Sequence, residues 1–495
     1  MTMQPQVRFK SRHVLLPLFA ALAVSACGGS DDNSLPTGAE AARPQDGRTF
    51  TPVVPTLSAL TNPAGTTAAP ETDRWVGVNK GASYAIEVPK NWNGMLVMYA
   101  HGYAGTGASL FAQTPAIRRH LISQGYAWAA SSYSKNYYDV RAGVEDTNAL
   151  ALAFNDIARA NGRALVAPSK TYIIGVSMGG HIAGAAVDEE NIRAANNKVR
   201  YDGAVPMCGV LGDTELFDYF TAYQVAAQKE AGIPATSWPV ANWAEIQPQV
   251  ISKLFSSFPI APTPSAAAVP SAQGQQLKTI VQNLTGGARP LFDVGYAGPL
   301  QSTVWGTFGS DGTITGVLNE RVVSTVNTAY QLDNNPAVSA AETTYNASVL
   351  RVQPVPDANR LRSDGLRWVP KTNALISVPV VTIHTLGDLY VPFSMEQIYK
   401  RRADALGTSN FLVQRAIRGV AHCDFTVAEQ ASAFNAMTNW EQNGVKPAGD
   451  DVLTPATVAD PKYGCKFTDN TLTPDDVTPT TRTSRTNPAL IPSCS

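Results

Sequence analysis

Short apolar runs recur along the middle of this chain and again near its end. They lie at residues 95–100, 126–130, 171–174, 204–207 and 380–385, and β-branched or aromatic side chains are frequent in them. Runs of this length that do not alternate with polar residues are typical of strands covered on both faces. The pattern therefore predicts a sheet whose central strands are fully buried.

Stretches with a helical period lie between these runs. Residues 144–159 place Leu150, Phe154 and Ile157 on one face, and a shorter helix is predicted over 116–123. Strands that alternate with helices predict an α/β fold with a mostly parallel sheet and helices on both faces. We expect this core to comprise residues 71–210 and 376–445, with an interruption between them.

The interruption covers residues 211–375. This stretch is far too long for a simple crossover between two strands. It begins with a helical pattern that carries Leu216, Phe217, Phe220 and Tyr223, and it includes a Pro/Ala/Ser-rich segment at 259–276. The sequence thus predicts a large insertion, in which the aromatic stripe is interpreted mainly as its own core.

The N-terminus has the features of an export signal. Three basic residues at 8–12 precede an apolar segment, 14–24, that is too short for a stable membrane span. The following Val-Ser-Ala-Cys ends at Cys27 and resembles a bacterial lipobox, although an ordinary signal peptide cleaved near Ala26 is the alternative. We expect residues 1–26 to be removed and the lipid on Cys27 to anchor the exported protein to a bacterial membrane, on its periplasmic or cell-surface side.

Two flanking segments lack periodicity. Residues 27–70 are rich in Pro, Thr, Ala and Gly, which predicts a flexible tether. Residues 446–495 are rich in Pro, Thr and Asp and are expected to form a C-terminal tail on the surface. The formal net charge of −1 gives no electrostatic footprint for nucleic acid, so the membrane contact we expect is the lipid anchor alone.

Four cysteines remain when Cys27 is set aside. Cys208, Cys423, Cys465 and Cys494 would form two disulfides in an exported protein, with three possible pairings. A bond between Cys465 and Cys494 would fasten the tail and leave Cys208 with Cys423; free buried cysteines are the alternative. Neither a zinc-type cysteine spacing nor an HExxH motif occurs, so no metal and no cofactor are expected.

The most informative motif is Gly175-Val176-Ser177-Met178-Gly179, a G-x-S-x-G sequence. It follows the apolar run at 171–174 and precedes small residues suited to a closely packed helix. A strand, a sharp turn and a helix form a nucleophile elbow, in which the serine hydroxyl is exposed above the sheet. We therefore expect Ser177 to be a nucleophile.

A serine nucleophile needs a base, and the base needs a carboxylate that orients it. His422 lies in a loop before a helix that Thr426 and Glu429 would cap, whereas His181 belongs to the helix after the elbow and His384 to a strand. His422 is thus the expected base.

The expected acid is Asp388, which follows the strand at 380–385. Asp202, Asp213 and Asp424 are the rivals, and Asp424 is too near His422 in sequence to face it comfortably. A carboxylate at the end of a strand can accept the imidazole N–H and hold the tautomer that leaves the other ring nitrogen free.

An oxyanion hole is the remaining requirement. The strand at 95–100 ends in His101-Gly102-Tyr103, followed by further glycines that allow the backbone to approach a developing negative charge. The backbone N–H groups of Met178 and Tyr103 are the expected donors. A phosphate-binding loop is the alternative, but the Walker lysine and the GxGxxG spacing are missing.

Together these motifs resemble the α/β-hydrolase superfamily over residues 75–210 and 378–444. The resemblance implies a Ser177, His422 and Asp388 triad, and a lid formed by the insertion. His422-Cys423 is also similar to the tannase and feruloyl-esterase group, in which the cysteine after the histidine bonds to one just before the serine; here that position is Val176.

The expected function is that of an exported serine hydrolase. It would cleave a small or oligomeric carboxylic ester through an acyl-enzyme intermediate. An amidase or peptidase with the same residues is one alternative, and a surface binding protein with an inactive hydrolase fold is another.

Overall fold

The computed structural model describes residues 40–63, 68–259, 267–298, 300–492 and 494. The predicted signal peptide and Cys27 lie outside these residues, so both stay predictions. No helix in the described ranges is long and apolar enough to cross a membrane.

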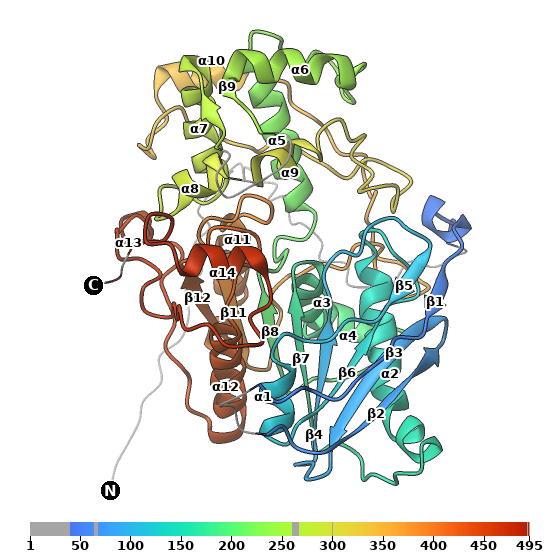
Figure 1. Ribbon diagram of the computed structural model, residues 1–495. Coiled ribbons are helices and arrows are strands. Elements are labelled where there is room, and N and C mark those ends of the chain that lie inside the picture. Colours follow the sequence, from blue (N-terminus) through green and yellow to red (C-terminus); the bar gives the residue numbers. More distant parts are fainter. Residues whose placement is uncertain (1–39, 64–67, 260–266, 299, 493, 495) are drawn as a thin grey trace, which may run out of the picture.

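An eight-stranded sheet forms the centre of the molecule (Figure 1). Across the sheet the strands are β12 (Leu412–Ile417), β11 (Val380–Thr385), β8 (Gly203–Met207), β7 (Lys170–Val176), β4 (Met95–Ala100), β6 (Ala127–Ser131), β3 (Ala82–Pro89) and β2 (Thr72–Asn79). The six strands from β12 to β6 are parallel, and β3 is antiparallel to both β6 and β2. The predicted α/β fold with a mostly parallel sheet is confirmed.

Both faces of the sheet are buried because its strands are apolar on both sides. Along β4, Leu96 and Met98 contribute to one hydrophobic cluster, whereas Val97 and Tyr99 contribute to the other. Successive side chains of a strand point to opposite faces, so one short run supplies two cores. This explains why the runs do not alternate with polar residues.

Helices cover the two faces in separate groups. The first cluster includes residues of α2 (Val140–Ala160) and α3 (Met178–Ala186), and the second includes residues of α1 (Arg118–Ser123) and α12 (Val427–Asn443). Two further helices connect core strands, namely α4 (Glu189–Ala194) and α11 (Ser394–Leu406), and a short 3-10 helix, η2 (Ser409–Phe411), precedes β12.

The residues between β8 and β11 form a separate, mainly helical layer beside the sheet (Figure 1). Its elements are α5 (Glu215–Glu230), α6 (Trp243–Leu254), β9 (Phe255–Ser257), β10 (Val269–Pro270), α7 (Ala272–Leu284), α8 (Phe292–Ala297), α9 (Leu300–Trp305) and α10 (Ala340–Ser348). Buried aromatic rings stabilise this layer: the ring of Tyr223 lies 6.0 Å from that of Trp305 and 5.2 Å from that of Phe308.

Part of the predicted tether belongs to the fold. A 3-10 helix, η1 (Pro44–Gly47), precedes β1 (Thr51–Val53), which pairs in parallel with β5 (Ser109–Phe111). The buried guanidinium of Arg43 forms a 2.7 Å ion pair with Asp139, the N-cap residue of α2. The prediction of a flexible tether is therefore wrong for residues 43–53, because partners far away in sequence hold this segment.

The C-terminal tail is also fastened to the core. It contains α13 (Pro455–Val458) and α14 (Pro479–Arg485), and a disulfide joins Cys465 to Cys494. Arg485 forms a fully buried 3.0 Å ion pair with Glu429 in the capping box of α12. Since α12 follows the His422 loop, the tail supports the helix that begins there.

Candidate active site

The order of the strands defines where a site is expected. The connection after β4 leads to β6 on one side, whereas the connection after β7 leads to β8 on the other. The loops at the carboxyl ends of these two neighbouring strands therefore diverge, and ligands of open α/β sheets bind at such a switch point. These loops carry the His101-Gly102-Tyr103 sequence and Ser177.

Ser177 occupies the predicted turn between β7 and α3. Its backbone has φ 58° and ψ −122°, a strained conformation for a residue with a Cβ. A Cβ at Gly175 would strike the carbonyl oxygen of Gly179, and one at Gly179 would strike that of Ala100. Both glycines of the motif are thus required by close backbone packing around the serine.

The structure brings Ser177, His422 and Asp388 together from three separate segments. His422 Nε2 lies 2.7 Å from Ser177 Oγ, and His422 Nδ1 lies 2.6 Å from Asp388 Oδ2. Asp388 is fully buried, whereas the side chain of His422 is 17% exposed. The other oxygen of Asp388 accepts hydrogen bonds from the backbone N–H groups of Tyr390 and Val391, at 2.9 and 3.0 Å, which fix the carboxylate.

The rival carboxylates have other partners. Asp213 forms an ion pair with Arg402 at 2.7 Å, and Asp202 accepts hydrogen bonds from Lys170 and the Thr171 backbone. Asp424 accepts a hydrogen bond from Ser484. None of these three contacts a histidine nitrogen by a hydrogen bond in the described structure, so the geometry singles out Asp388.

The other two histidines after the serine are buried in the core. His384, in β11, lies 3.3 Å from Glu396 and 2.8 Å from the Val391 carbonyl. His181, in α3, lies between the Tyr138 hydroxyl at 2.9 Å and the Pro370 carbonyl at 2.7 Å. Burial lowers the pKa of His181 to about 4, so this ring is neutral at neutral pH.

The buried, neutral His181 should make the protein acid-sensitive. Its pKa rises to the ordinary value of 6.5 on unfolding, so the unfolded state takes up a proton first as the pH falls. We expect His181 to cost about 3 kcal/mol of stability between pH 6.5 and pH 4. Urea unfolding of wild type and His181→Gln across this range should show a shallower pH dependence in the variant; parallel curves would contradict the assignment.

The loop after β4 lies directly beside the serine. A Cβ built on Gly102 would be 3.2 Å from Ser177 Cβ and 3.8 Å from Ser177 Oγ. The following Tyr103 places its side chain at the cavity described below, and Met178 begins α3. The ring of His101 is buried and stacks on Tyr133 at 4.2 Å, which holds the loop in place.

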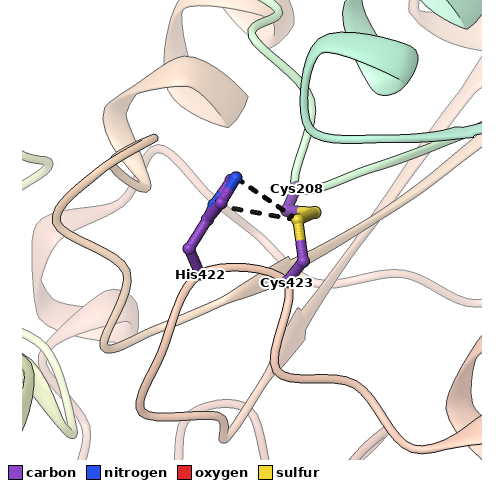
Figure 2. Close-up of side chains that lie close together, drawn as sticks. All are labelled: Cys208, His422 and Cys423. Atoms are coloured by element: carbon purple, nitrogen blue, oxygen red, sulfur yellow. Dashed lines mark hydrogen bonds between the residues drawn. A yellow bond between two sulfur atoms is a disulfide. The ribbon is translucent and has the colours of Figure 1, made fainter. Parts of the chain in front are cut away.

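A disulfide between Cys208 and Cys423 connects the serine region to the histidine loop. Figure 2 shows the imidazole of His422 beside this bond, with Cys423 Sγ 3.4 Å from Nε2. Cys208 directly follows Met207, whose carbonyl accepts a hydrogen bond from the Ser177 N–H at 3.0 Å. The disulfide therefore fastens His422 to the strand that neighbours the nucleophile.

In the described part of the chain, the cluster of possible metal ligands consists of Cys208, His422 and Cys423. Their sulfur and nitrogen atoms lie within 4.8 Å of one another. Metal binding requires thiolates, and both sulfurs are committed to the disulfide. The cluster is thus a disulfide beside a histidine, and this disulfide holds the backbone next to His422 in place.

A cavity of about 500 Å³ opens at Ser177, within the range of about 300–1,000 Å³ typical of ligand pockets. None of its lining residues carries a formal charge. They are Tyr103, Tyr138, Ser177, Val210, Leu216, Phe217, Phe220, Thr221, Gln224, Trp238, Gly306, Thr307, Phe308, Gly309, Ser310, Gly312, Ile314, Thr315, Val323, Tyr390 and Val391.

Several of these residues were not predicted from the sequence. The ring of Tyr390 lies 5.5 Å from that of His422 and 5.7 Å from that of Phe220. The aromatic stripe of α5 was interpreted as core; Tyr223 is buried with Trp305, but Phe217 and Phe220 line the cavity. The 16-residue helix α5 is more than four turns long and contacts both layers, so different positions of the stripe can serve the two purposes. The stripe was the sequence signal available for these cavity residues.

No family model matches the chain. It is 21% identical over 414 residues to an o-phthalyl amidase from Xanthobacter agilis, covering 74% of this chain and 87% of that protein.

Similar solved structures are feruloyl esterase B from Aspergillus oryzae and tannin acyl hydrolase from Aspergillus niger. The first is 13% identical with a TM-score of 0.37, over 81% of this chain and 86% of that one. The second is 13% identical with a TM-score of 0.38, over 80% and 83%. The fold class itself follows from the strand order and the strand–serine–helix turn.

Proposed function

We propose that this protein is a serine hydrolase that cleaves carboxylic esters at Ser177. The observation that carries the proposal is the pair of contacts of His422, 2.7 Å to Ser177 Oγ and 2.6 Å to Asp388 Oδ2. They join a strained elbow serine, a base and a fully buried carboxylate at the mouth of a cavity. This is the arrangement that a serine needs in order to become a nucleophile at neutral pH.

In the proposed reaction, Asp388 accepts the Nδ1–H of His422, so that Nε2 can take the proton of Ser177. The serine oxygen attacks the acyl carbon, and the backbone N–H groups of Met178 and Tyr103 stabilise the resulting oxyanion. His422 returns the proton to the leaving alcohol, which gives an acyl-Ser177. Water, deprotonated by His422, then releases the acid and regenerates the serine.

The cavity favours uncharged substrates. Its lining contains aromatic and aliphatic side chains and no cationic group that could pair with an anionic substituent. Desolvation of a charge without a partner is strongly unfavourable. We therefore propose neutral esters with an apolar or aromatic portion as substrates.

Amide hydrolysis is the second candidate. The same three residues can cleave amides, and the o-phthalyl amidase similarity covers most of the chain. An amide nitrogen must be protonated as it leaves, and His422 Nε2 lies where it could supply that proton as well. A matched ester and amide therefore separate the two activities.

The test uses protein that starts at residue 28. We expect a fluorophosphonate probe to form a covalent adduct, mapped by mass spectrometry to Ser177, and p-nitrophenyl esters to be cleaved much faster than the matching p-nitroanilides. Anilide turnover comparable with ester turnover would favour the amidase. The absence of any adduct together with no turnover of either substrate would refute the serine hydrolase.

A further inference from the structure

Gln224 has a side-chain hydrogen-bond donor for which the described residues provide no acceptor. The side chain is 1% exposed and lines the cavity at Ser177. Its Oε1 accepts a hydrogen bond from the Gly309 N–H at 2.8 Å, which fixes which end of the amide is oxygen. Its Nε2 has no partner among the described residues. A buried donor without an acceptor is unfavourable unless a ligand supplies one.

Trp238 lines the same cavity and carries a second such donor. Its indole Nε1 is buried and also lacks a partner in the described structure. Unlike these two donors, the hydroxyl groups of Thr221 and Tyr138 in the cavity lining have acceptors within the protein. Thr221 donates to the Phe217 carbonyl at 3.0 Å, and Tyr138 donates to His181. The proton of Tyr138 must point to His181 Nδ1, since Nε2–H of that ring donates to Pro370.

The position of Gln224 along α5 places this donor at a definite depth. Phe220 packs against Tyr390, whose ring contacts His422. Gln224 follows Phe220 by four residues, which is one helical turn or about 6 Å along the axis. Gln224 therefore lies about one helical turn along α5 from Phe220, whose ring neighbours Tyr390 beside His422.

We propose that Gln224 Nε2 and Trp238 Nε1 form a specificity subsite for an uncharged acceptor oxygen. The group bound there would be an aromatic or apolar moiety that ends in a carbonyl or ether oxygen about one helical turn beyond the reacting ester. The inference rests on the proposed ester hydrolase and specifies its substrate class. A carboxylate could also accept these hydrogen bonds, but the cavity offers it no cation.

Binding of paired esters tests the subsite without turnover. An acetyl and an isopropyl group have nearly the same shape, and only the acetyl group has an acceptor oxygen. Calorimetry on Ser177→Ala protein would compare phenyl 4-acetylbenzoate with phenyl 4-isopropylbenzoate, and 4-acetylphenyl benzoate with 4-isopropylphenyl benzoate. We expect the acetyl member of at least one pair to bind about tenfold more tightly.

Two substitutions identify the donors. Gln224→Met keeps the length of the side chain but removes the Nε2–H donor together with the acceptor of the Gly309 N–H, and we expect it to abolish the acetyl preference. Trp238→Phe keeps an aromatic ring without the N–H and should reduce the preference severalfold. Gln228→Met is the matched control, since Gln228 is equally buried one turn further along α5 and does not line the cavity; its preference should equal that of the parent.

The outcomes separate this inference from the proposed function. Equal binding within both ester pairs, or an acetyl preference that survives Gln224→Met, would overturn the subsite. If Ser177 of the wild-type protein did not react with a fluorophosphonate, the proposed serine hydrolase activity would be refuted. The subsite would then be judged from the binding of the paired esters alone.

Discussion

Replacing Ser177 by alanine should lower kcat for ester hydrolysis about a millionfold. The substitution removes the attacking oxygen, and no other hydroxyl forms a hydrogen bond with His422 Nε2 in the described structure. The residual rate would come from binding and from the oxyanion donors, which remain in place. Steady-state kinetics on p-nitrophenyl esters measures the loss. Wild-type active sites are counted by fluorophosphonate titration, whereas the variant is quantified as total folded protein, because it lacks the oxygen that the probe labels.

Ser169→Ala provides the control for this experiment. Ser169 immediately precedes β7, at the opposite end of the strand from Ser177, and its hydroxyl donates to the Gly94 carbonyl at 3.0 Å. We expect its kcat to stay within about twofold of wild type, as for most surface substitutions. A Ser177→Ala enzyme that retained more than about a hundredth of the wild-type kcat would show that another group attacks the ester.

The core of the fold was predictable because its signals are local. Each central strand is an apolar run between turn residues. The nucleophile elbow is recognisable from the glycines at 175 and 179. The order of the strands was not predictable from these runs, because register and neighbours depend on contacts between distant segments. The same reason applies to β1, whose three residues pair with β5 some sixty positions later.

The candidate triad was predictable because each member sits at a recognisable place. Ser177 follows a strand, Asp388 follows another, and His422 precedes a capped helix. Sequence alone could not remove Asp213 from the rivals, since its partner Arg402 lies 189 positions away. The cavity was the least predictable part, because Tyr390, Trp238 and Gln224 acquire a common function only when the two layers meet.

Asp388→Asn should lower kcat about ten-thousandfold while leaving the fold intact. The Tyr390 and Val391 N–H groups both donate to Asp388 Oδ1. An asparagine must keep its oxygen on these donors, so its NH2 group takes the place of Oδ2 and points at His422 Nδ1. Two donors cannot face each other, and the imidazole would shift its proton to Nε2.

The proton on Nε2 is what would stop the reaction, because that nitrogen could no longer accept the proton of Ser177. The variant should therefore bind substrate with a nearly unchanged KM and lose kcat, and its fluorophosphonate labelling should slow in parallel. Asp388→Ala serves as a comparison for stability. It leaves the backbone N–H groups of Tyr390 and Val391 unpaired, so it should lower the melting temperature, whereas Asp388→Asn should not. A kcat for Asp388→Asn within tenfold of wild type would mean that another group orients His422. The Cys208–Cys423 disulfide and the ring of Tyr390, 5.5 Å away, are the neighbours that could hold the imidazole.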